Sequence, residues 1–368
     1  MKVLTIFGTR PEIIRLSLIM KKLDGYCDHK TVHTGQNYDE SLSDVFLRDL
    51  KVRTPDHHFN IKAKSFGEQI GRILEKTEEI VDLEKPDKIL ILGDTNSALS
   101  AIIAARKGVP VFHMEAGNRC FDDRVPEEVN RRIIDHSSAI LLPYTERSKE
   151  NLTDEGIPRE RIYVTGNPIY EVLETFKDEI DQSKSLEQFD VAENKYFLVT
   201  LHRAENVDKE ERLKKIFEGF HKIADKYKKK ILISVHPRTA EKLKNFDIET
   251  KNEDIVLMNP LGFFDFVNLE KNAFCVLTDS GTVQEECAIF HTPNVTIRDV
   301  TERPETLECG SNIISGANTE SLLLSVEIAT KETSNWLAPT EYKKENVSQT
   351  VLKILLGYTS VRKHPNQI

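Results

Sequence analysis

The chain has 368 residues, which is enough for about two domains whose cores need no disulfide or metal to hold them. Its 51 Lys and Arg against 60 Asp and Glu give a net charge of -9, which argues against a nucleic-acid binder. No apolar run reaches the ~18 residues of a membrane span, no signal peptide is expected, and five cysteines without a CxxC pair indicate free thiols in a reducing cytoplasm rather than a metal site.

The first half of the chain alternates short apolar runs with segments of helical period. Strands are expected at residues 3–7, 31–33, 88–92, 110–113 and 139–142, and helices at 11–23, 97–107 and 126–136. Apolar strands without polar alternation are typical of a parallel sheet covered on both faces by helices. We therefore predict a Rossmann-like domain over residues 1–169, although the GxGxxG fingerprint is absent.

The same rhythm returns in the second half, after an acidic stretch over residues 171–193. Strands are expected at residues 196–200, 230–235, 254–258, 273–278 and 294–297, and helices at 209–227 and 283–290. This pattern predicts a second Rossmann-like domain over residues 170–340. Residues 342–356 are expected to form a last helix within a C-terminal segment, 341–368.

Polar residues follow seven of the predicted strands. They lie at residues 8–12, 34–36, 93–95, 114–117, 201–203, 236–238 and 278–282. In open parallel sheets, ligands bind outside the carboxyl ends of the strands. The repeated pattern predicts a ligand cleft between two facing domains.

Carboxylates that suit acid–base chemistry are found at two of these strand ends. Asp94 and Glu115 follow successive strands, and two carboxylates that share a cleft raise one another's pKa. Glu127 lies four residues before Arg131 on a predicted helix, which makes it a third carboxylate held by an arginine. The alternatives stay open: a helix cap for Asp94, a loop salt bridge for Glu115 and a surface ion pair for the last two.

The turn Ser280-Gly281-Thr282 opens a predicted helix that contains Glu286. Backbone N–H groups and the helix dipole favour a phosphate at such a turn. A carboxylate one turn into the helix can accept hydrogen bonds from the hydroxyls of a ribose. The alternative is a capped helix with acidic residues in its first turn.

Positive charge is also available at the strand ends. His202 and His236 each follow an apolar strand with an arginine nearby, which suggests contacts to a diphosphate. Arg10 and Arg15 offer further positive charge from the other domain. The histidines at 57–58 lack a ligand pattern, and we interpret them as surface residues.

Seven strings, in order along almost the whole chain, together resemble the non-hydrolysing UDP-N-acetylglucosamine 2-epimerase family. They are GTRPEIIR (8–15), GDTNSAL (93–99), HMEAGNRCFDDRVPEEVNRR (113–132), VTGNP (164–168), TLHRAEN (200–206), TDSGTVQEE (278–286) and TERPE (301–305). The resemblance implies a GT-B architecture of two Rossmann-like domains with the active site in the cleft between them. It also implies a homodimer, a C-terminal helix that packs back on the first domain, and no cofactor or metal.

The activity implied by the resemblance is inversion at C2 of a UDP-N-acetylhexosamine, by elimination of UDP, re-protonation of C2 from the opposite face and return of UDP to C1. The implied catalytic groups are Asp94, Glu115, Glu127, Arg131 and His202. The implied UDP contacts are Arg10, His236, Ser280, Gly281 and Glu286, with Arg15 and Thr282 beside them. Within this activity, UDP-N-acetylglucosamine and UDP-N-acetylmannosamine are the leading pair, for the synthesis of surface polysaccharide precursors.

The chain departs from the family pattern in four places. Arg15 replaces a frequent lysine, and Thr282 replaces the second glycine of SGG. Residues 36–39 lack the Gln-x-x-Gln of members that a second UDP-sugar activates, which puts such activation in doubt. The loop 117–122 is similar to that of the branch that makes UDP-N-acetyl-L-fucosamine from UDP-2-acetamido-2,6-dideoxy-L-talose.

Other functions stay open on the sequence alone. A GT-B glycosyltransferase could use the turn at 280–286, but the carboxylates of the first domain would then lack a purpose. A sensor that binds a UDP-sugar without turnover is a further alternative, and so is a hydrolysing epimerase that releases UDP and free N-acetylmannosamine.

Overall fold

The computed structural model describes residues 1–35, 40–250, 252–332 and 335–357 of the chain. It divides into two compact units. The first contains residues 1–175 together with the C-terminal segment from residue 341, and the second is Phe176–Thr340. Among the described residues, no helix has the length and apolar character needed to cross a membrane.

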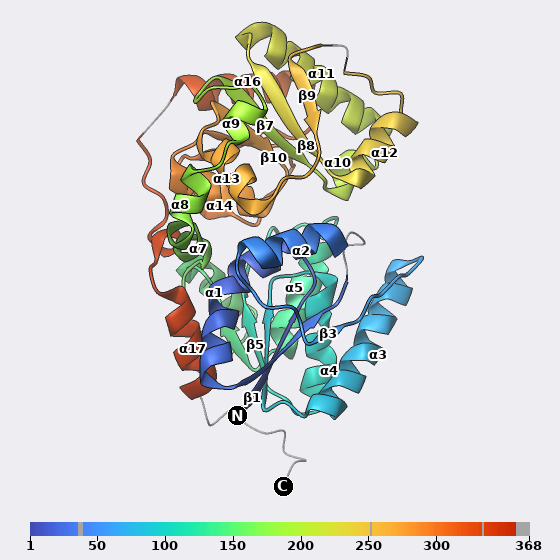
Figure 1. Ribbon diagram of the computed structural model, residues 1–368, viewed down its shortest axis with the longest axis vertical. Coiled ribbons are helices and arrows are strands. Elements are labelled where there is room, and N and C mark those ends of the chain that lie inside the picture. Colours follow the sequence, from blue (N-terminus) through green and yellow to red (C-terminus); the bar gives the residue numbers. More distant parts are fainter. Residues whose placement is uncertain (36–39, 251, 333–334, 358–368) are drawn as a thin grey trace. The chain divides into compact units, whose positions relative to one another are not determined.

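The first unit is built on a six-stranded parallel sheet in the order β3-β2-β1-β4-β5-β6 (Figure 1). Its strands are β1 (Lys2–Phe7), β2 (Asp28–His33), β3 (His57–His58), β4 (Lys88–Leu92), β5 (Val111–Met114) and β6 (Ile140–Leu142). Its helices are α1 (Arg10–Tyr26), α2 (Glu40–Asp49), α3 (Phe66–Glu84), η1 (Asn96–Ser100), α4 (Ala101–Arg106), α5 (Pro126–Ser137), α6 (Glu146–Asp154), η2 (Arg159–Arg161) and α7 (Ile169–Thr175). All five residues of β4 are buried, as expected for a strand with helices on both faces.

The second unit repeats this topology with the sheet order β12-β11-β10-β7-β8-β9, again all parallel. Its strands are β7 (Tyr196–Leu201), β8 (Lys230–Val235), β9 (Ile255–Met258), β10 (Cys275–Thr278), β11 (Asn294–Thr296) and β12 (Asn312–Ile314). Its helices are α8 (Lys177–Asp181), α9 (Ser185–Gln188), α10 (Ala204–Val207), α11 (Glu210–Tyr227), α12 (Pro237–Asn245), α13 (Phe263–Lys271), α14 (Gly281–Phe290), α15 (Pro304–Glu308) and α16 (Thr319–Lys331). Counted from the first strand of each unit, both sheets follow the order 3-2-1-4-5-6 of the Rossmann fold.

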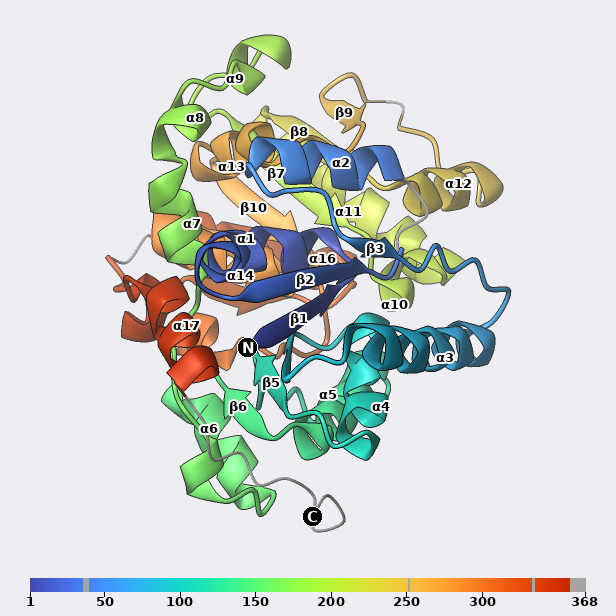
Figure 2. The same cartoon turned by 60° about the horizontal axis from the view of Figure 1, so that its bottom comes forward.

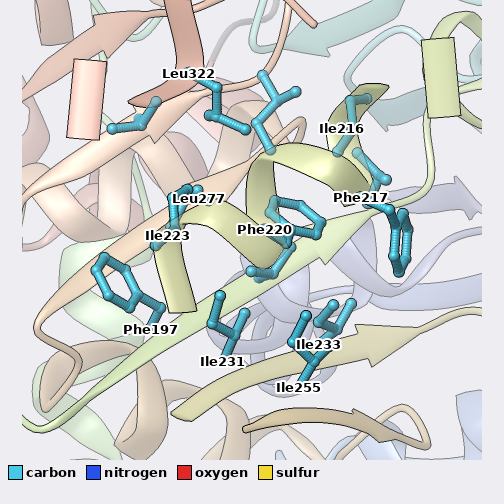
Figure 3. Close-up of a cluster of buried hydrophobic side chains, with 14 of the residues drawn as sticks. Phe197, Ile216, Phe217, Phe220, Ile223, Ile231, Ile233, Ile255, Leu277 and Leu322 are labelled. Atoms are coloured by element: carbon cyan, nitrogen blue, oxygen red, sulfur yellow. The ribbon is translucent and has the colours of Figure 1, made fainter. Parts of the chain in front are cut away.

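The core of the second unit lies between its sheet and helices α11 and α16 (Figure 3). Phe217 and Phe220 of α11 pack edge to face at 5.3 Å, and both are buried. Leu322 of α16 joins the same cluster. Burial of each such side chain contributes about 1.5–3 kcal/mol, so this helix layer holds the sheet in place.

The chain returns to the first unit after residue 340. A turn, η3 (Thr340–Lys343), leads to α17 (Val347–Gly357), which lies beside α1 (Figures 1 and 2). The backbone N–H of Ser348 donates to Glu171 of α7 at 2.8 Å, which satisfies a donor of the first turn of α17.

The prediction of an α/β chain with two parallel, Rossmann-like sheets is confirmed, and local details differ. Residues 57–58 form the edge strand β3, where His57 Nε2 lies 2.8 Å from Glu84 Oε1 while His58 is exposed. Residues 342–356, expected as one helix, are divided between η3 and α17. The acidic stretch 171–193 includes the short helices α8 and α9, and β12 was not predicted.

Candidate functional site

Arg131 of α5 joins two carboxylates at the carboxyl ends of the strands of the first unit. Helix α5 begins at Pro126, whose fixed φ suits the first helical turn. The Nε of Arg131 donates to Asp94 Oδ2 at 2.8 Å, and Nη1 donates to Glu128 Oε2 at 2.6 Å. The structure therefore brings Asp94 and Arg131 together. Glu127 lies half-buried in the first turn, and the carboxylate at 2.6 Å from Arg131 is its neighbour Glu128.

Glu128 is a buried residue that the sequence analysis did not select. It accepts the backbone N–H groups of Cys120 and Phe121, each at 3.0 Å. Burial opposes its ionisation, but these hydrogen bonds and Arg131 outweigh burial and hold the pKa of Glu128 below its usual value. An ionised Glu128 thus ties the loop 117–122 to α5 and, through Arg131, to Asp94.

Glu115 follows β5 in an unusual backbone conformation. Its φ is 64°, in the left-handed region that residues other than glycine rarely adopt. Its carboxylate is largely buried, lies 3.7 Å from Nη1 of Arg15 on α1, and accepts from Asn118 at 3.4 Å. Such strain persists where the surroundings fix it, and it is frequent at functional sites. The structure thus brings Arg15 to Glu115.

A buried pair, His113 and Asp135, connects the loops that bear the two predicted catalytic carboxylates. The Nε2 of His113 lies 2.8 Å from the carbonyl oxygen of Gly93, and its Nδ1 lies 2.8 Å from Asp135. Asp135 also accepts from the N–H of Gly117 and pairs with Arg119 at 2.8 Å. Burial opposes the charge of Asp135, but His113 and Arg119 outweigh it and lower its pKa. The pair fixes the loops after β4 and β5 relative to each other.

Glu12, in the first turn of α1, connects the loops after β1 and β4. Its carboxylate accepts from the N–H groups of Gly8 and Thr9 at 2.7 Å each and from the hydroxyl of Thr95 at 2.8 Å. Burial raises the pKa of Glu12 to about 7, although these hydrogen bonds oppose the shift. Arg10, two residues earlier, places its guanidinium 5.7 Å from the ring centre of Phe46.

His202 and Asp279 form a pair at the carboxyl ends of β7 and β10 in the second unit. Asp279 is fully buried, and its Oδ1 lies 3.1 Å from Nδ1 of His202. It also accepts from the backbone N–H of Arg203 and from the side chain of Asn206, at 2.9 and 3.1 Å. Burial opposes its charge, but His202 and these donors outweigh burial and lower the pKa of Asp279. The side chain of His202 remains 47% exposed.

The turn 280–282 opens α14 in the same unit. Ser280 is the residue before the helix, and its hydroxyl lies 3.1 Å from that of Thr282. A Cβ at Gly281 would meet the carboxylate of Glu302, so the backbone there approaches its neighbour closely. His236 is the N-cap of α12, where its Nδ1 accepts the N–H of Arg238 at 3.4 Å.

Glu286, further along α14, is buried next to a second carboxyl group. Glu270 of α13 lies fully buried next to it and accepts from the thiol of Cys287 at 3.3 Å. Burial and the charge of Glu286 raise the pKa of Glu270 well above its usual value. In its protonated form, Glu270 can donate a hydrogen bond to the carboxylate of Glu286.

The positions that depart from the Gln-x-x-Gln pattern, residues 36–39, lie outside the described residues. Within the described ranges, no group of three or more His, Cys, Asp or Glu residues is placed to hold a metal ion. The sequence analysis missed Glu12, His113, Glu128, Asp135 and Asp279. Four of these, Glu12, His113, Glu128 and Asp279, lie inside strings that the family resemblance quoted, and only Asp135 lies outside them.

Two Rossmann-like sheets in one chain, with polar strand ends in both units, define an α/β protein of the GT-B-like class. Phytolacca americana UGT2, solved with UDP-2-fluoro-glucose and pterostilbene, has the same fold at 9% identity and a TM-score of 0.58, covering 97% of this chain and 98% of that one. The sequence pattern of the UDP-N-acetylglucosamine 2-epimerase family matches residues 21–356. The chain belongs to this family.

Two comparisons with members of the family support the assignment. The UDP-N-acetylglucosamine 2-epimerase of Methanocaldococcus jannaschii is 44% identical over 347 residues, which cover 92% of this chain and 95% of that protein. A crystal structure of the UDP-GlcNAc 2-epimerase of this organism, in complex with UDP-GlcNAc and UDP, superposes with a TM-score of 0.92 at 41% identity. That match covers 97% of this chain and 100% of the other. The predicted resemblance is thereby confirmed.

Proposed function

We propose that this chain is a non-hydrolysing epimerase that interconverts UDP-N-acetylglucosamine and UDP-N-acetylmannosamine. The observation that carries the proposal is membership, over almost the whole chain, of a family whose relatives have this activity in their names. The acid–base groups at the strand ends of the first unit supply the chemistry that the reaction needs.

The reaction requires loss of a proton from a carbon that is not next to a carbonyl group. In the first half, the C1–O bond breaks and its electron pair leaves with UDP, while a base takes the C2 proton and a C1–C2 double bond forms. In the second half, an acid protonates C2 from the opposite face and UDP adds again at C1. Two faces require two proton-transfer groups, and the leaving diphosphate requires a cationic or N–H cradle.

Asp94 and Glu115 are the groups that we propose for the proton transfers at C2. Asp94 is 21% exposed and is oriented by the guanidinium of Arg131, so it is both accessible and fixed. Glu115 is held by Arg15 and by its own left-handed backbone. Fixed orientation places a reacting group near its transition-state position before the substrate arrives. We propose Glu127, in the first turn of α5, as a further acid–base group.

The second unit supplies the groups that we propose for UDP. The N–H groups of Gly281 and Thr282 lie at a helix start and suit the diphosphate, and the hydroxyl of Ser280 lies beside them. Glu286 suits the ribose hydroxyls because it is an acceptor supported by the protonated Glu270 next to it. We propose His236 for a contact to the phosphates and His202 as a group that can exchange a proton. Arg10, which belongs to the first unit, is proposed as a further phosphate contact.

The loop 117–122 supports a second candidate substrate. Arg119 in this loop is buried, donates to Glu155 at 2.7 Å and pairs with Asp135, while Phe121 is exposed at a φ of 55°. This rigid loop follows Glu115, so its shape can select the sugar. The alternative substrate is UDP-2-acetamido-2,6-dideoxy-L-talose, with the same chemistry at C2.

We also propose that the protein acts as a homodimer in the cytoplasm. All five cysteines are free thiols, which suits a reducing compartment. Light scattering of the purified protein tests the dimer directly, because a monomeric mass at enzyme concentrations would contradict it.

Product analysis tests the proposed function. The purified protein is incubated separately with UDP-N-acetylglucosamine and with the 6-deoxy-L-talosamine nucleotide, and products are separated by ion-exchange chromatography. We expect UDP-N-acetylmannosamine from the first, formed at least on the order of 10²-fold more slowly by the Asp94→Asn variant. Free N-acetylmannosamine with UDP would indicate a hydrolysing enzyme. Transfer of the sugar to an acceptor, with no epimer formed, would contradict the proposal.

A further inference from the structure

Several N–H groups donate to the carboxylate of Asp279. Its Oδ2 accepts from the backbone N–H groups of His202 and Arg203 and from Nδ2 of Asn206, at 2.9 to 3.1 Å. The orientation of the Asn206 amide is fixed, because its Oδ1 accepts from Nε of Arg212 at 2.8 Å. Three N–H groups therefore converge on one oxygen of a carboxylate that is fully buried.

These donors determine where the proton between Asp279 and His202 resides. A carboxylate surrounded by N–H groups is favoured in its ionised form, and an ionised carboxylate can only accept hydrogen bonds. Its Oδ1 lies 3.1 Å from Nδ1 of His202. A bare Nδ1 would set two acceptors against each other, so these contacts favour the tautomer with the hydrogen on Nδ1. In this neutral tautomer, Nε2 carries no hydrogen and can accept a proton. The side chain of His202 is half-exposed, so a ligand can approach it.

We propose that Asp279 is the positioning residue of His202, which it locks in the Nδ1–H tautomer so that Nε2 is the atom that exchanges a proton. When Nε2 takes a proton, the imidazolium stands next to the carboxylate of Asp279, which stabilises it. The participation of Nε2 in turnover rests on the proposed epimerase function. The tautomer itself does not, because it follows from the contacts of Asp279 alone.

Replacement of Asp279 by asparagine changes the tautomer for a definite reason. An amide has only one oxygen, and three N–H groups converge at the position of Oδ2 while His202 Nδ1 faces the position of Oδ1. The amide oxygen is therefore expected at the Oδ2 position, with the NH2 group towards Nδ1. That NH2 group donates, so Nδ1 becomes an acceptor and the hydrogen moves to Nε2.

The first test measures the tautomer in the unaltered protein by NMR of the 15N-labelled histidines at a pH where His202 is neutral. The His202→Gln variant identifies the His202 signals by their loss. We expect Nδ1 at the shift of a protonated nitrogen and Nε2 at that of a bare nitrogen. A bare Nδ1 with a protonated Nε2 would overturn the proposal, whether or not the protein turns over UDP-sugars.

The second test uses Asp279→Asn, with Asp181→Asn as the matched control. Asp181 is a half-exposed residue of the same unit that pairs with Lys271 at 2.7 Å, outside the contacts of Asp279. For Asp279→Asn we expect the opposite tautomer and a fall in kcat on the order of 10²-fold or more, with UDP still bound in calorimetry. The control should keep both tautomer and kcat. An unchanged tautomer with full kcat in Asp279→Asn would overturn the proposal, and if this variant does not fold, the NMR of the unaltered protein still decides. If the tautomers are as expected but the protein forms no epimer, the proposed function is contradicted and the role of Asp279 in setting the tautomer still holds.

Discussion

Arg131 and Asp94 form an ion pair of 2.8 Å that joins α5 to the loop after β4. The same guanidinium donates to the buried Glu128, so one side chain orients two carboxylates and balances one of their two negative charges. A planar guanidinium can bind two partners in fixed directions, whereas an ammonium group is a single point charge. Catalysis and stability are therefore expected to depend on the same residue.

Arg131→Lys should keep a positive charge and yet lower kcat on the order of 10²-fold, because a lysine cannot hold Asp94 and Glu128 in place together. Arg131→Met should also cost about 3–5 kcal/mol in the free energy of unfolding, since it leaves a buried carboxylate without its partner. Turnover assays and urea denaturation measure the two effects. The neighbouring Arg132→Met, which removes a 43% exposed side chain, is the control. Equal effects at the two positions would contradict this account.

The variants Asp94→Asn and Glu115→Gln each replace a carboxylate by an amide of nearly the same shape. We expect each to lower turnover on the order of 10²-fold or more, as for a lost acid or base. Glu146→Gln, on the surface of α6, should leave turnover unchanged. Near-normal turnover in both Asp94→Asn and Glu115→Gln would show that neither carboxylate moves a proton.

Glu12 should make the stability of the first unit depend on pH. Its pKa in the folded protein is raised to about 7, so the folded state binds a proton that the unfolded chain releases above ~4.3. This group therefore stabilises the folded protein below about pH 4, by a few kcal/mol at most. The stabilisation is lost as the pH rises to about 7. Glu12→Gln should remove this part of the pH dependence. Denaturation curves of both proteins between pH 5 and 8 measure it, and parallel pH profiles would rule it out.

Gly281→Ala should weaken UDP binding by about tenfold or more. The added methyl group would meet the carboxylate of Glu302, which is buried and held by Arg298 at 2.7 Å, so neither can move aside easily. The start of α14 must then shift away from the phosphate position. Calorimetry with UDP measures the effect. Gly71→Ala, where the added atom meets nothing within 4 Å, should bind UDP as the unaltered protein does.

The fold class could be predicted from the sequence because its signals are local. The expected strands 88–92 and 230–235 coincide with β4 and β8, and helix 126–136 differs from α5 by one residue. Two-residue elements such as β3 leave no periodicity to detect. The break between η3 and α17 was missed because the polar residues 343–346 contain neither Gly nor Pro to mark it.

The candidate site was only partly predictable, because its pairs are tertiary. Asp135 lies 22 residues from His113, and Asp279 lies 77 residues from His202. Neither pair can be predicted from a short sequence spacing. Glu127 and Glu128 are adjacent in the sequence. Only the rotation of α5 against the loop 117–122 decides that Glu128 receives the 2.6 Å hydrogen bond from Arg131.

The most direct test of the central claim is proton NMR of the purified protein with UDP-N-acetylglucosamine in D2O. The account predicts that UDP-N-acetylmannosamine appears with deuterium at C2, because the proton removed from one face is replaced by one from solvent on the other. A folded protein that binds UDP and yet produces neither the epimer nor exchange at C2 would contradict the claim.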